Sequence, residues 1–211
     1  MHEKSYIVMR GWAFRYELLS NGNQQIINYY LPGDIISPFA AVMPKTNYSV
    51  ASVNKMELCV FENDELIELF IKHPRIGLYY GWMLGREDSS LAEQIVRLGR
   101  RSAYQRTAHL LLELFHRLKI VGLAYDKENA FPLPVTQQLL ADTLGMSAVH
   151  MNRTLKKLQH ANLITVSFEK IYLDDIDSLK QVAEFENTFL EQAKSHLLTG
   201  FNGFRNIASS A

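Results

Sequence analysis

Residues 136–158 have the pattern of two helical segments joined by a short turn that contains Gly145, and this spacing constrains the fold more than any other feature of the chain. Thr136 and Ser147 each precede a helical run, and their hydroxyls can accept a hydrogen bond from the backbone near the start of that run. Gly145 supplies a tight turn between the runs. Ala141 is small at the point where a second helix must cross closely. The segment therefore predicts a helix-turn-helix.

The second of these helices has an apolar face and a face rich in donors and positive charge. At 100° per residue, the apolar side consists of Met151, Leu155 and Leu158, and the other of Val149, Arg153 and Lys156, flanked by Asn152 and Lys157. An isolated helix of this kind is often merely solvated, but here it follows a capped helix and a glycine turn. Residues 147–160 also contain no acidic side chain. These features are typical of a recognition helix that enters the DNA major groove.

Two short strands are expected directly after this helix. Residues 163–168 and 171–173 are rich in apolar and β-branched side chains, and Glu169 and Lys170 lie between them. A hairpin at this position is the wing of a winged helix. The combination predicts binding to double-stranded DNA.

The first sixty residues have a different pattern, with short apolar and alternating runs typical of strands. These runs cover residues 6–9, 11–19, 25–30, 48–53 and 57–61. Asn21 and Gly22 lie between the second and third runs and form a strong hairpin signal, because both residue types tolerate positive φ. The pattern predicts an antiparallel all-β unit.

A long helix is expected from Arg75 to about Arg101, after the break at His73 and Pro74. Its apolar positions recur every seven residues, with two further residues on the same seam: Leu84, Asp88, Leu91, Ile95 and Leu98. A heptad seam favours pairing with a second copy of the chain. The alternative is packing against the chain's own β-unit, which looks too small to cover the whole helix.

Composition and charge exclude several classes of protein. No apolar run approaches the roughly 18 residues of a membrane span, and the first ten residues lack a signal-peptide core. We therefore expect a cytoplasmic protein without a membrane partner. Cys59 is the only cysteine, so a disulfide within the chain, a cysteine-held zinc and an iron–sulfur cluster are excluded. We expect neither metal nor cofactor.

An enzyme is the main alternative from a different class. A β-roll is compatible with a metal-binding cupin, but the β-region offers only His2 and His73 as imidazole ligands. The sequence also has no glycine-rich phosphate loop and no Gly-x-Ser-x-Gly nucleophile motif. We therefore predict that the protein is not an enzyme.

The chain resembles the Crp/Fnr family of bacterial regulators over about residues 6–185. The matching motifs are Gly11-Trp12-Ala13, the Leu31–Asp34 run, the long central helix, residues 136–158 and Asn162-Leu163-Ile164. Residues 144–155 are similar to a subgroup common in alphaproteobacteria. The resemblance implies an α+β protein with a cyclic-nucleotide-binding-like β-roll, a dimerisation helix and a winged helix-turn-helix. It also implies a homodimer on palindromic promoter sites, and RNA polymerase as a further partner.

The region that matches the family's effector pocket departs from the cyclic AMP pattern. Cyclic-AMP-binding members carry a glutamate that holds the ribose and an arginine that pairs with the cyclic phosphate. The corresponding stretches here are Ser37-Pro38-Phe39 and Tyr48-Ser49. A buried phosphate without a cationic partner is costly, so we expect no response to cyclic AMP. The sequence names no other effector.

The DNA-reading positions also depart from the family pattern. Many members begin the recognition helix with Arg-Glu, whereas this chain has Ala148-Val149 and keeps only the later arginine, Arg153. We therefore expect an operator that differs from that of the Glu-bearing members. The predicted DNA-binding residues are Thr136, Gln137, Ser147, Ala148, Val149, His150, Asn152, Arg153, Lys156 and Lys157.

The expected organisation has four parts. Residues 1–74 form a β-roll, 75–101 the dimerisation helix, 102–185 the winged helix-turn-helix unit and 186–211 a C-terminal tail. Family members usually have further strands before the segment that matches Tyr6. Three alternatives follow: the roll is incomplete, the sequence starts too late, or the sensory pocket has been lost. The predicted function is a sequence-specific transcription regulator. The alternatives are a winged helix used for protein contacts and a degenerate regulator without effector control.

Overall fold

The computed structural model describes residues 4–37, 48–168 and 170–186. The elements run as β1(Lys4–Arg10), β2(Ala13–Leu18), β3(Gln24–Tyr30), β4(Ile35–Ile36), β5(Ser49–Ser52), β6(Glu57–Glu62), α1(Asn63–Lys72), α2(Pro74–Arg100), α3(Ala103–Ile120), η1(Asp126–Glu128), β7(Ala130–Pro132), α4(Gln137–Leu144), α5(Ala148–His160), β8(Ile164–Ser167), β9(Lys170–Leu173) and α6(Ile176–Ala183). The mixed α+β class predicted from the sequence is confirmed.

The N-terminal strands form two antiparallel sheets of three strands each, with orders β4-β1-β6 and β3-β2-β5. Both sheets remain open among the described residues. The expected hairpin joins β2 to β3, with Gly22 at φ 84°. Gly11 is needed for a different reason, because a Cβ at this position would lie 2.3 Å from the carbonyl oxygen of Lys55.

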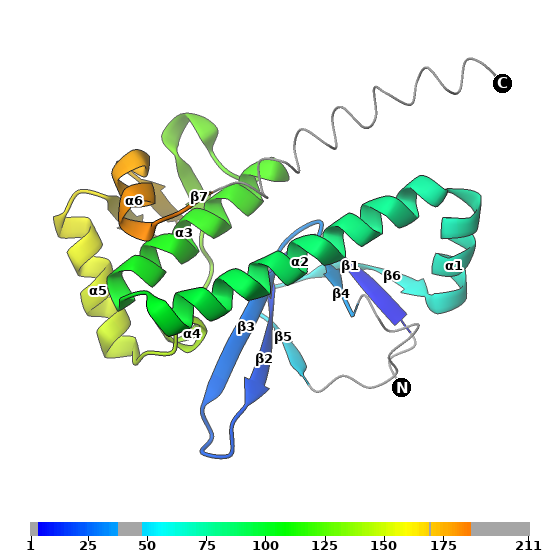
Figure 1. The fold of residues 1–211 in the computed structure, drawn as a ribbon, viewed down its shortest axis with the longest axis horizontal. Helices are drawn as coiled ribbons and strands as arrows, with labels where there is room; N and C mark the ends of the chain where they lie inside the picture. The colour runs from blue at the N-terminus through cyan, green and yellow to red at the C-terminus, as the bar shows by residue number, and fades with distance from the viewer. Residues whose placement is uncertain (1–3, 38–47, 169, 187–211) are drawn as a thin grey trace.

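Helix α2 runs along the β-sheets and joins them to the C-terminal helices (Figure 1). The break before it falls where expected, since α1 ends at Lys72 and Pro74 is the first residue of α2. Glu62 occupies the N-cap position of α1. The Glu62 side chain accepts from the backbone of Glu65, whose side chain reaches back to the Glu62 N–H.

Helix α3 is the most deeply buried element. Its apolar side chains pack against α5 and α6, and the same cluster continues into the N-terminal sheets through Trp12, Phe14 and Ile26. The segment after α3 contains the short strand β7, which pairs with β9. A continuous core therefore joins the β-sheets to the helix-turn-helix unit. The four-part division of the chain stays a prediction.

None of the helices in the described ranges is long and apolar enough to cross a membrane.

Candidate nucleic-acid interface

Helices α4 and α5 form the predicted helix-turn-helix, with both caps in place. Thr136 Oγ1 accepts a hydrogen bond from the Leu139 N–H at 3.2 Å, and Ser147 Oγ accepts one from the His150 N–H at 3.2 Å. Gly145 ends α4 in the left-handed region, with φ 60° and ψ 47°. This conformation costs glycine little and other residues more, so the glycine fixes the angle at which α5 leaves.

Helix α5 is divided into faces as the sequence predicts. Met151, Leu155 and Leu158 are buried in the core, together with Thr154, whose hydroxyl donates back to the His150 carbonyl oxygen at 2.9 Å. On the opposite side of the helix, Arg153 and Lys156 are exposed, and Val149 is 63% exposed. An apolar side chain held in solvent at the start of such a helix is free to contact a thymine methyl group.

The structure places the predicted DNA-binding residues on one side of the helix-turn-helix. Thr136, Gln137, Ser147, Val149, His150, Arg153, Lys156 and Lys157 are exposed, and Ala148 and Asn152 are half-buried. Asn152 is held in place, because its side-chain amide donates to Gln137 Oε1 at 2.9 Å. This hydrogen bond joins the exposed side of α5 to the first turn of α4.

The wing forms from β8 and β9 as expected, and β7 adds a third strand beside β9. Phe168 at its turn is 89% exposed, and Val166 on the preceding strand is 39% exposed. A groove of about 290 Å³ is lined by Thr136 and Gln137 from α4 and by Val166 and Lys170 from the wing, among others. The wing thus lies beside the start of α4, where Thr136 and Gln137 are predicted to bind DNA.

Phe168 and Lys170 are surface residues of this site that the sequence prediction did not include. Lys170 Nζ lies 4.4 Å from the ring centre of Tyr125. The signal was present in the sequence, because Lys170 lies at the predicted turn of the wing and Phe168 ends the strand predicted before it. Alternation alone does not reveal which turn residues are exposed, so the structure was needed to identify them.

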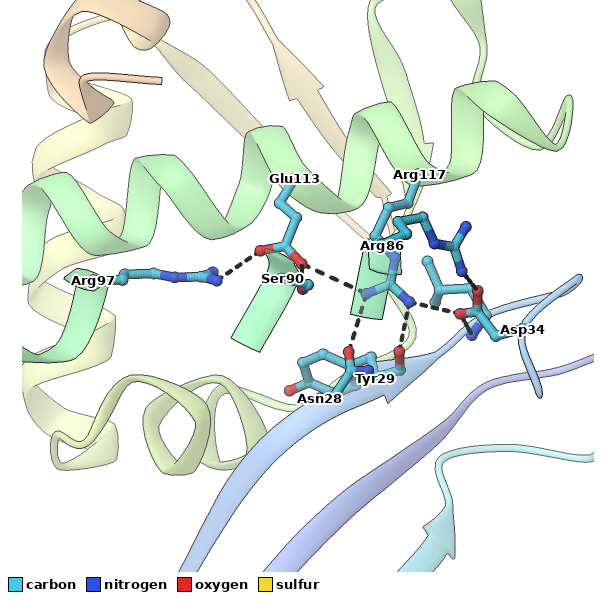
Figure 2. Close-up of polar contacts among 9 residues, drawn as sticks. Asn28, Tyr29, Asp34, Arg86, Ser90, Arg97, Glu113 and Arg117 are labelled. Atoms are coloured by element: carbon cyan, nitrogen blue, oxygen red, sulfur yellow. Dashed lines mark hydrogen bonds and ion pairs between the residues drawn. The ribbon is translucent and has the colours of Figure 1, made fainter. Parts of the chain in front are cut away.

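A buried network of charges connects the helix-turn-helix unit to the rest of the chain (Figure 2). On α3, Arg117 donates to Asp34 Oδ2 at 2.6 Å and to the Tyr29 carbonyl oxygen at 2.7 Å. Arg86 of α2 pairs with the other carboxylate oxygen of Asp34. Farther along, Arg97 of α2 donates to Glu113 Oε2 of α3 at 2.6 Å.

These carboxylates are held in the charged form by their arginine partners. Burial alone would raise the pKa of Asp34, but the guanidinium groups of Arg117 and Arg86 outweigh it and lower the pKa below its ordinary value. The pKa of Glu113 is lowered in the same way, since Arg97 and Arg117 overcome the effect of its burial. The network therefore consists of paired charges that are costly to separate.

The residues of the predicted dimer seam fall into two groups. Asp88 is exposed and Ile95 is 72% exposed, whereas Leu84, Leu91 and Leu98 are half-buried. Leu84 lines a cavity beside Asp34, and a Cβ on Gly145 would lie 3.7 Å from a methyl group of Leu98. The leucine stripe thus lies partly against its own chain.

The predicted effector pocket is described only in part, because Pro38 and Phe39 lie outside the described residues. Ser37 is buried, and its carbonyl oxygen accepts from Ser5 Oγ at 3.1 Å. Ser49 is exposed at the start of β5. Tyr48 lies beneath Arg15, whose guanidinium carbon is 3.8 Å from the ring centre.

Arg15 is a cation near this pocket that the sequence prediction missed. It comes from β2, and its Nη1 lies 3.7 Å from Glu87 Oε1 of α2. A cavity of about 30 Å³ nearby is lined by Tyr30, Asp34, Arg86, Glu87 and others. A cavity of this size holds a few water molecules at most, whereas ligand pockets typically have several hundred cubic ångströms.

A capped helix-turn-helix with a solvent-facing basic helix and an adjacent wing defines a DNA-binding protein of the winged-helix class. Comparison with known proteins agrees with this class. The family profile of the Crp-like helix-turn-helix domain matches residues 105–182.

Curated relatives extend the match over most of the chain. It is 30% identical over 170 residues to the nitrogen fixation regulation protein FixK of Bradyrhizobium diazoefficiens, which covers 81% of this chain and 70% of FixK. It is 31% identical over 164 residues to the transcriptional activatory protein AadR of Rhodopseudomonas palustris, covering 76% of this chain and 65% of AadR, slightly under two thirds.

Solved structures show the same fold. FixK2 from Bradyrhizobium japonicum superposes with a TM-score of 0.73 at 22% identity, over 86% of this chain and 87% of that one. TTHB099 from Thermus thermophilus gives 0.67 at 19% identity, over 87% and 89%. The chain belongs to the Crp/Fnr family of transcription regulators. It is accordingly a DNA-binding regulator and not an enzyme.

Proposed function

We propose that the protein binds two-fold symmetric promoter sites as a homodimer, and that it does so without cyclic AMP. The observation that carries this proposal is the exposed face of α5, where Val149, Arg153 and Lys156 face solvent while both helix caps are formed. A symmetric dimer presents two such helices, and these fit half-sites about one helical turn, roughly 34 Å, apart.

We propose that two copies pair along a line of exposed residues on α2. The line consists of Leu78, Gly81, Gly85, Asp88, Ala92, Ile95 and Gly99, all exposed in the single chain. Their spacing alternates between three and four residues, as in a coiled-coil seam. Three glycines and an alanine allow two helices to approach closely. This line shares Asp88 and Ile95 with the seam predicted from the sequence.

Independence from cyclic AMP is supported by the charges near the pocket. The one arginine beside Tyr48 among the described residues, Arg15, is already paired with Glu87. Binding a cyclic phosphate there would require Arg15 to give up that partner. Asp34, which follows the family's Pro-Gly turn, is likewise occupied by Arg86 and Arg117.

The reading of bases is proposed to differ from that of Glu-bearing family members. In this proposal Arg153 reads a guanine edge and Val149 contacts a thymine methyl group. His150, Lys156, Lys157 and the start of α4 at Thr136 are expected to contact phosphates or neighbouring bases. Because the protein acts on DNA and as a regulator of transcription, we place it in the cytoplasm with RNA polymerase as a partner.

Selection of bound sequences from random duplex DNA, with the purified full-length chain and no added ligand, tests the proposal. The expected result is a two-fold symmetric motif with half-sites about one turn apart. Recovery of the half-site usual for Glu-bearing members contradicts the proposed reading. DNA binding through Lys and Arg is strongest at low salt. Absence of binding even at low salt therefore favours the alternative of a winged helix used for protein contacts.

A further inference from the structure

The C-terminal end of α4 is held by side chains from two other parts of the chain. Thr143, the penultimate residue of α4, is 2% exposed. Its carbonyl oxygen accepts from Gln94 Nε2 of α2 at 2.9 Å and from Gln25 Nε2 of β3 at 3.1 Å. A carbonyl oxygen has two lone pairs, so both are used.

The Thr143 hydroxyl also contacts Tyr29, and the chemistry of the two groups determines which of them donates the hydrogen bond. The hydroxyl donates its only hydrogen to the Leu139 carbonyl oxygen at 2.8 Å. Tyr29 Oη lies 2.8 Å from the same hydroxyl oxygen, so Tyr29 must be the donor. Tyr29 is 2% exposed, and burial raises the pKa of its hydroxyl, which keeps the proton in place.

Asp142, the residue before Thr143, is also bound by a side chain of β3. Gln24 Nε2 of β3 donates to Asp142 Oδ2 at 2.8 Å. The amide orientation of Gln25 is fixed as well, because its nitrogen also donates to the Ile26 carbonyl oxygen at 2.9 Å. Four side chains, three from β3 and one from α2, thus bind two consecutive residues of α4. We call Gln24, Gln25, Tyr29 and Gln94 the α4 clamp.

The clamp lies next to the turn that aims the recognition helix. Thr143 is followed by Leu144 and by Gly145, and α5 begins at Ala148. Helices α4 and α5 share buried side chains, including Leu140 and Met151, so they move together. A shift of the end of α4 against α2 therefore changes the direction of α5.

The clamp leaves the DNA-reading side of α5 open. Val149, Arg153 and Lys156 are exposed while all the clamp hydrogen bonds are formed. A contact that blocked DNA binding would be expected to cover these residues. We propose that the α4 clamp is a positioning device that fixes the recognition helix relative to α2 in the orientation that reads DNA, so that no effector is needed to set it.

This inference rests on the proposed homodimer, because the position of α5 relative to α2 sets the distance between the two recognition helices. One half-site is read by one α5, so its affinity does not depend on that distance. A site with two half-sites is read only when both helices fit the spacing. Loss of the clamp should therefore weaken binding to a site with two half-sites and leave binding to a single half-site unchanged.

The experiment compares two duplexes by fluorescence anisotropy, one with both half-sites of the selected operator and one with a single intact half-site. Gln94→Glu and Gln25→Glu keep the side-chain size but remove the donor. Tyr29→Phe removes only the hydroxyl and serves as the mildest variant. Gln181→Glu, exposed on α6, is the matched control for the change in charge. Thermal unfolding and sedimentation confirm that each variant is folded and dimeric.

We expect the clamp variants to bind the two-half-site duplex about tenfold to a hundredfold more weakly than the original chain, the range expected when one or two buried hydrogen bonds are lost. Binding to the single half-site should stay within about twofold of the original chain, a smaller change than one lost hydrogen bond produces. The clamp variants should also show a weaker preference for the operator over duplexes with one base pair added or removed between the half-sites, because α5 is no longer held at one angle. A purely structural role does not change this preference for spacing.

Four results overturn the proposed role of the clamp, three from the variants and one from the original chain. Equal losses on both duplexes mean that the recognition helix itself is damaged. Tighter binding by the variants means that the contact restrains the protein. An unchanged preference for spacing means that other contacts set the angle. If the original chain gains nothing from a second half-site, the proposed homodimer function fails and the clamp fails with it.

Discussion

At the scale of single residues, Arg153 carries the strongest expectation about base reading. It is exposed in the middle of α5, on the side opposite the buried Met151 and Leu155. An arginine in this place binds two acceptors of a guanine at once in the major groove, and such a pair contributes about 1–3 kcal/mol of discrimination. The residue is thus expected to specify a base and not merely to add charge.

Arg153→Ala is expected to weaken binding to the selected operator by about tenfold to a hundredfold. The measurement is anisotropy at fixed salt, with operator and random duplexes in parallel. Lys127→Ala removes one positive charge from an exposed position in η1 and is the control. An equal loss on operator and random DNA would show that Arg153 contacts phosphate only.

His109 on α3 is a buried neutral imidazole. Its Nε2 lies 3.2 Å from Glu93 Oε2, and among the described residues its Nδ1 has no hydrogen-bond partner. Burial and the nearby Arg97 charge lower the pKa of His109 to about 3, although Glu113 acts in the opposite direction. In the unfolded chain a histidine has a pKa near 6.5.

The pH dependence of stability follows from this difference. Between about pH 6.5 and 3 the unfolded chain binds a proton at His109 that the folded chain does not. The free energy of unfolding should therefore fall as the pH is lowered below about 6.5, by up to about 1.4 kcal/mol per unit. Urea unfolding at pH 7, 6 and 5 measures this slope above the range in which Asp34 and Glu113 titrate. His109→Gln should reduce it, and an unchanged slope would assign it to other groups.

At the scale of elements, the turn between α4 and α5 depends on backbone conformation more than on space. A Cβ at Gly145 would meet Leu98 Cδ2 at 3.7 Å and Gln25 Oε1 at 3.9 Å, which are ordinary contacts. The φ of 60° is nevertheless in the left-handed region, where an L-residue other than asparagine or aspartate is strained by about 1–2 kcal/mol.

Gly145→Ala is expected to lower the free energy of unfolding by about 1–2 kcal/mol, and Gly145→Asn by less, because asparagine tolerates this conformation. Urea denaturation of the three proteins provides the comparison. If the alanine and asparagine variants lose the same free energy of unfolding, backbone strain is not the cause of the loss, and crowding by neighbouring atoms is.

The winged unit and the β-sheets are linked at two levels. The first level is the buried ion pairs that join Asp34 to Arg117 of α3 and Arg86 of α2, and the second is the α4 clamp, which joins β3 and α2 to α4. Charged pairs in a buried position are costly to break because each leaves an uncompensated charge. The two levels together explain why one core runs from the β-sheets to the helix-turn-helix.

At the scale of the whole molecule, the exposed line on α2 makes a prediction about assembly. Ile95 is 72% exposed and lies between Ala92 and Gly99 on this line. A charge there would be buried against its counterpart in a close helix pair, without a partner. Pairing along this line should therefore be very sensitive to Ile95.

Ile95→Arg is expected to convert the dimer to a monomer at micromolar concentration, as measured by sedimentation velocity. It should also weaken binding to a two-half-site duplex and leave the single half-site nearly unaffected. Met9→Arg is the matched control, since Met9 is 57% exposed on β1, outside α2. A variant that remains a dimer would exclude this line and favour a different face of α2.

Most elements could be predicted from the sequence because their signals are local. The caps Thr136 and Ser147, the turn at Gly145 and the buried face of α5 all follow from side chains within one or two helical turns. The hairpin at Asn21 and Gly22 and the break before Pro74 are equally local. Backbone conformation and helical periodicity suffice for such features.

Only the tertiary structure decided which faces and which distant residues meet. Periodicity shows that α2 has an apolar stripe, but the half-burial of Leu84, Leu91 and Leu98 depends on the elements that pack beside them. The contact between Gln25 and Thr143 joins residues 118 positions apart, and that between Asp34 and Arg117 spans 83. Sequence patterns determine the elements of this protein, whereas the angle of its recognition helix depends on hydrogen bonds that only folding brings together.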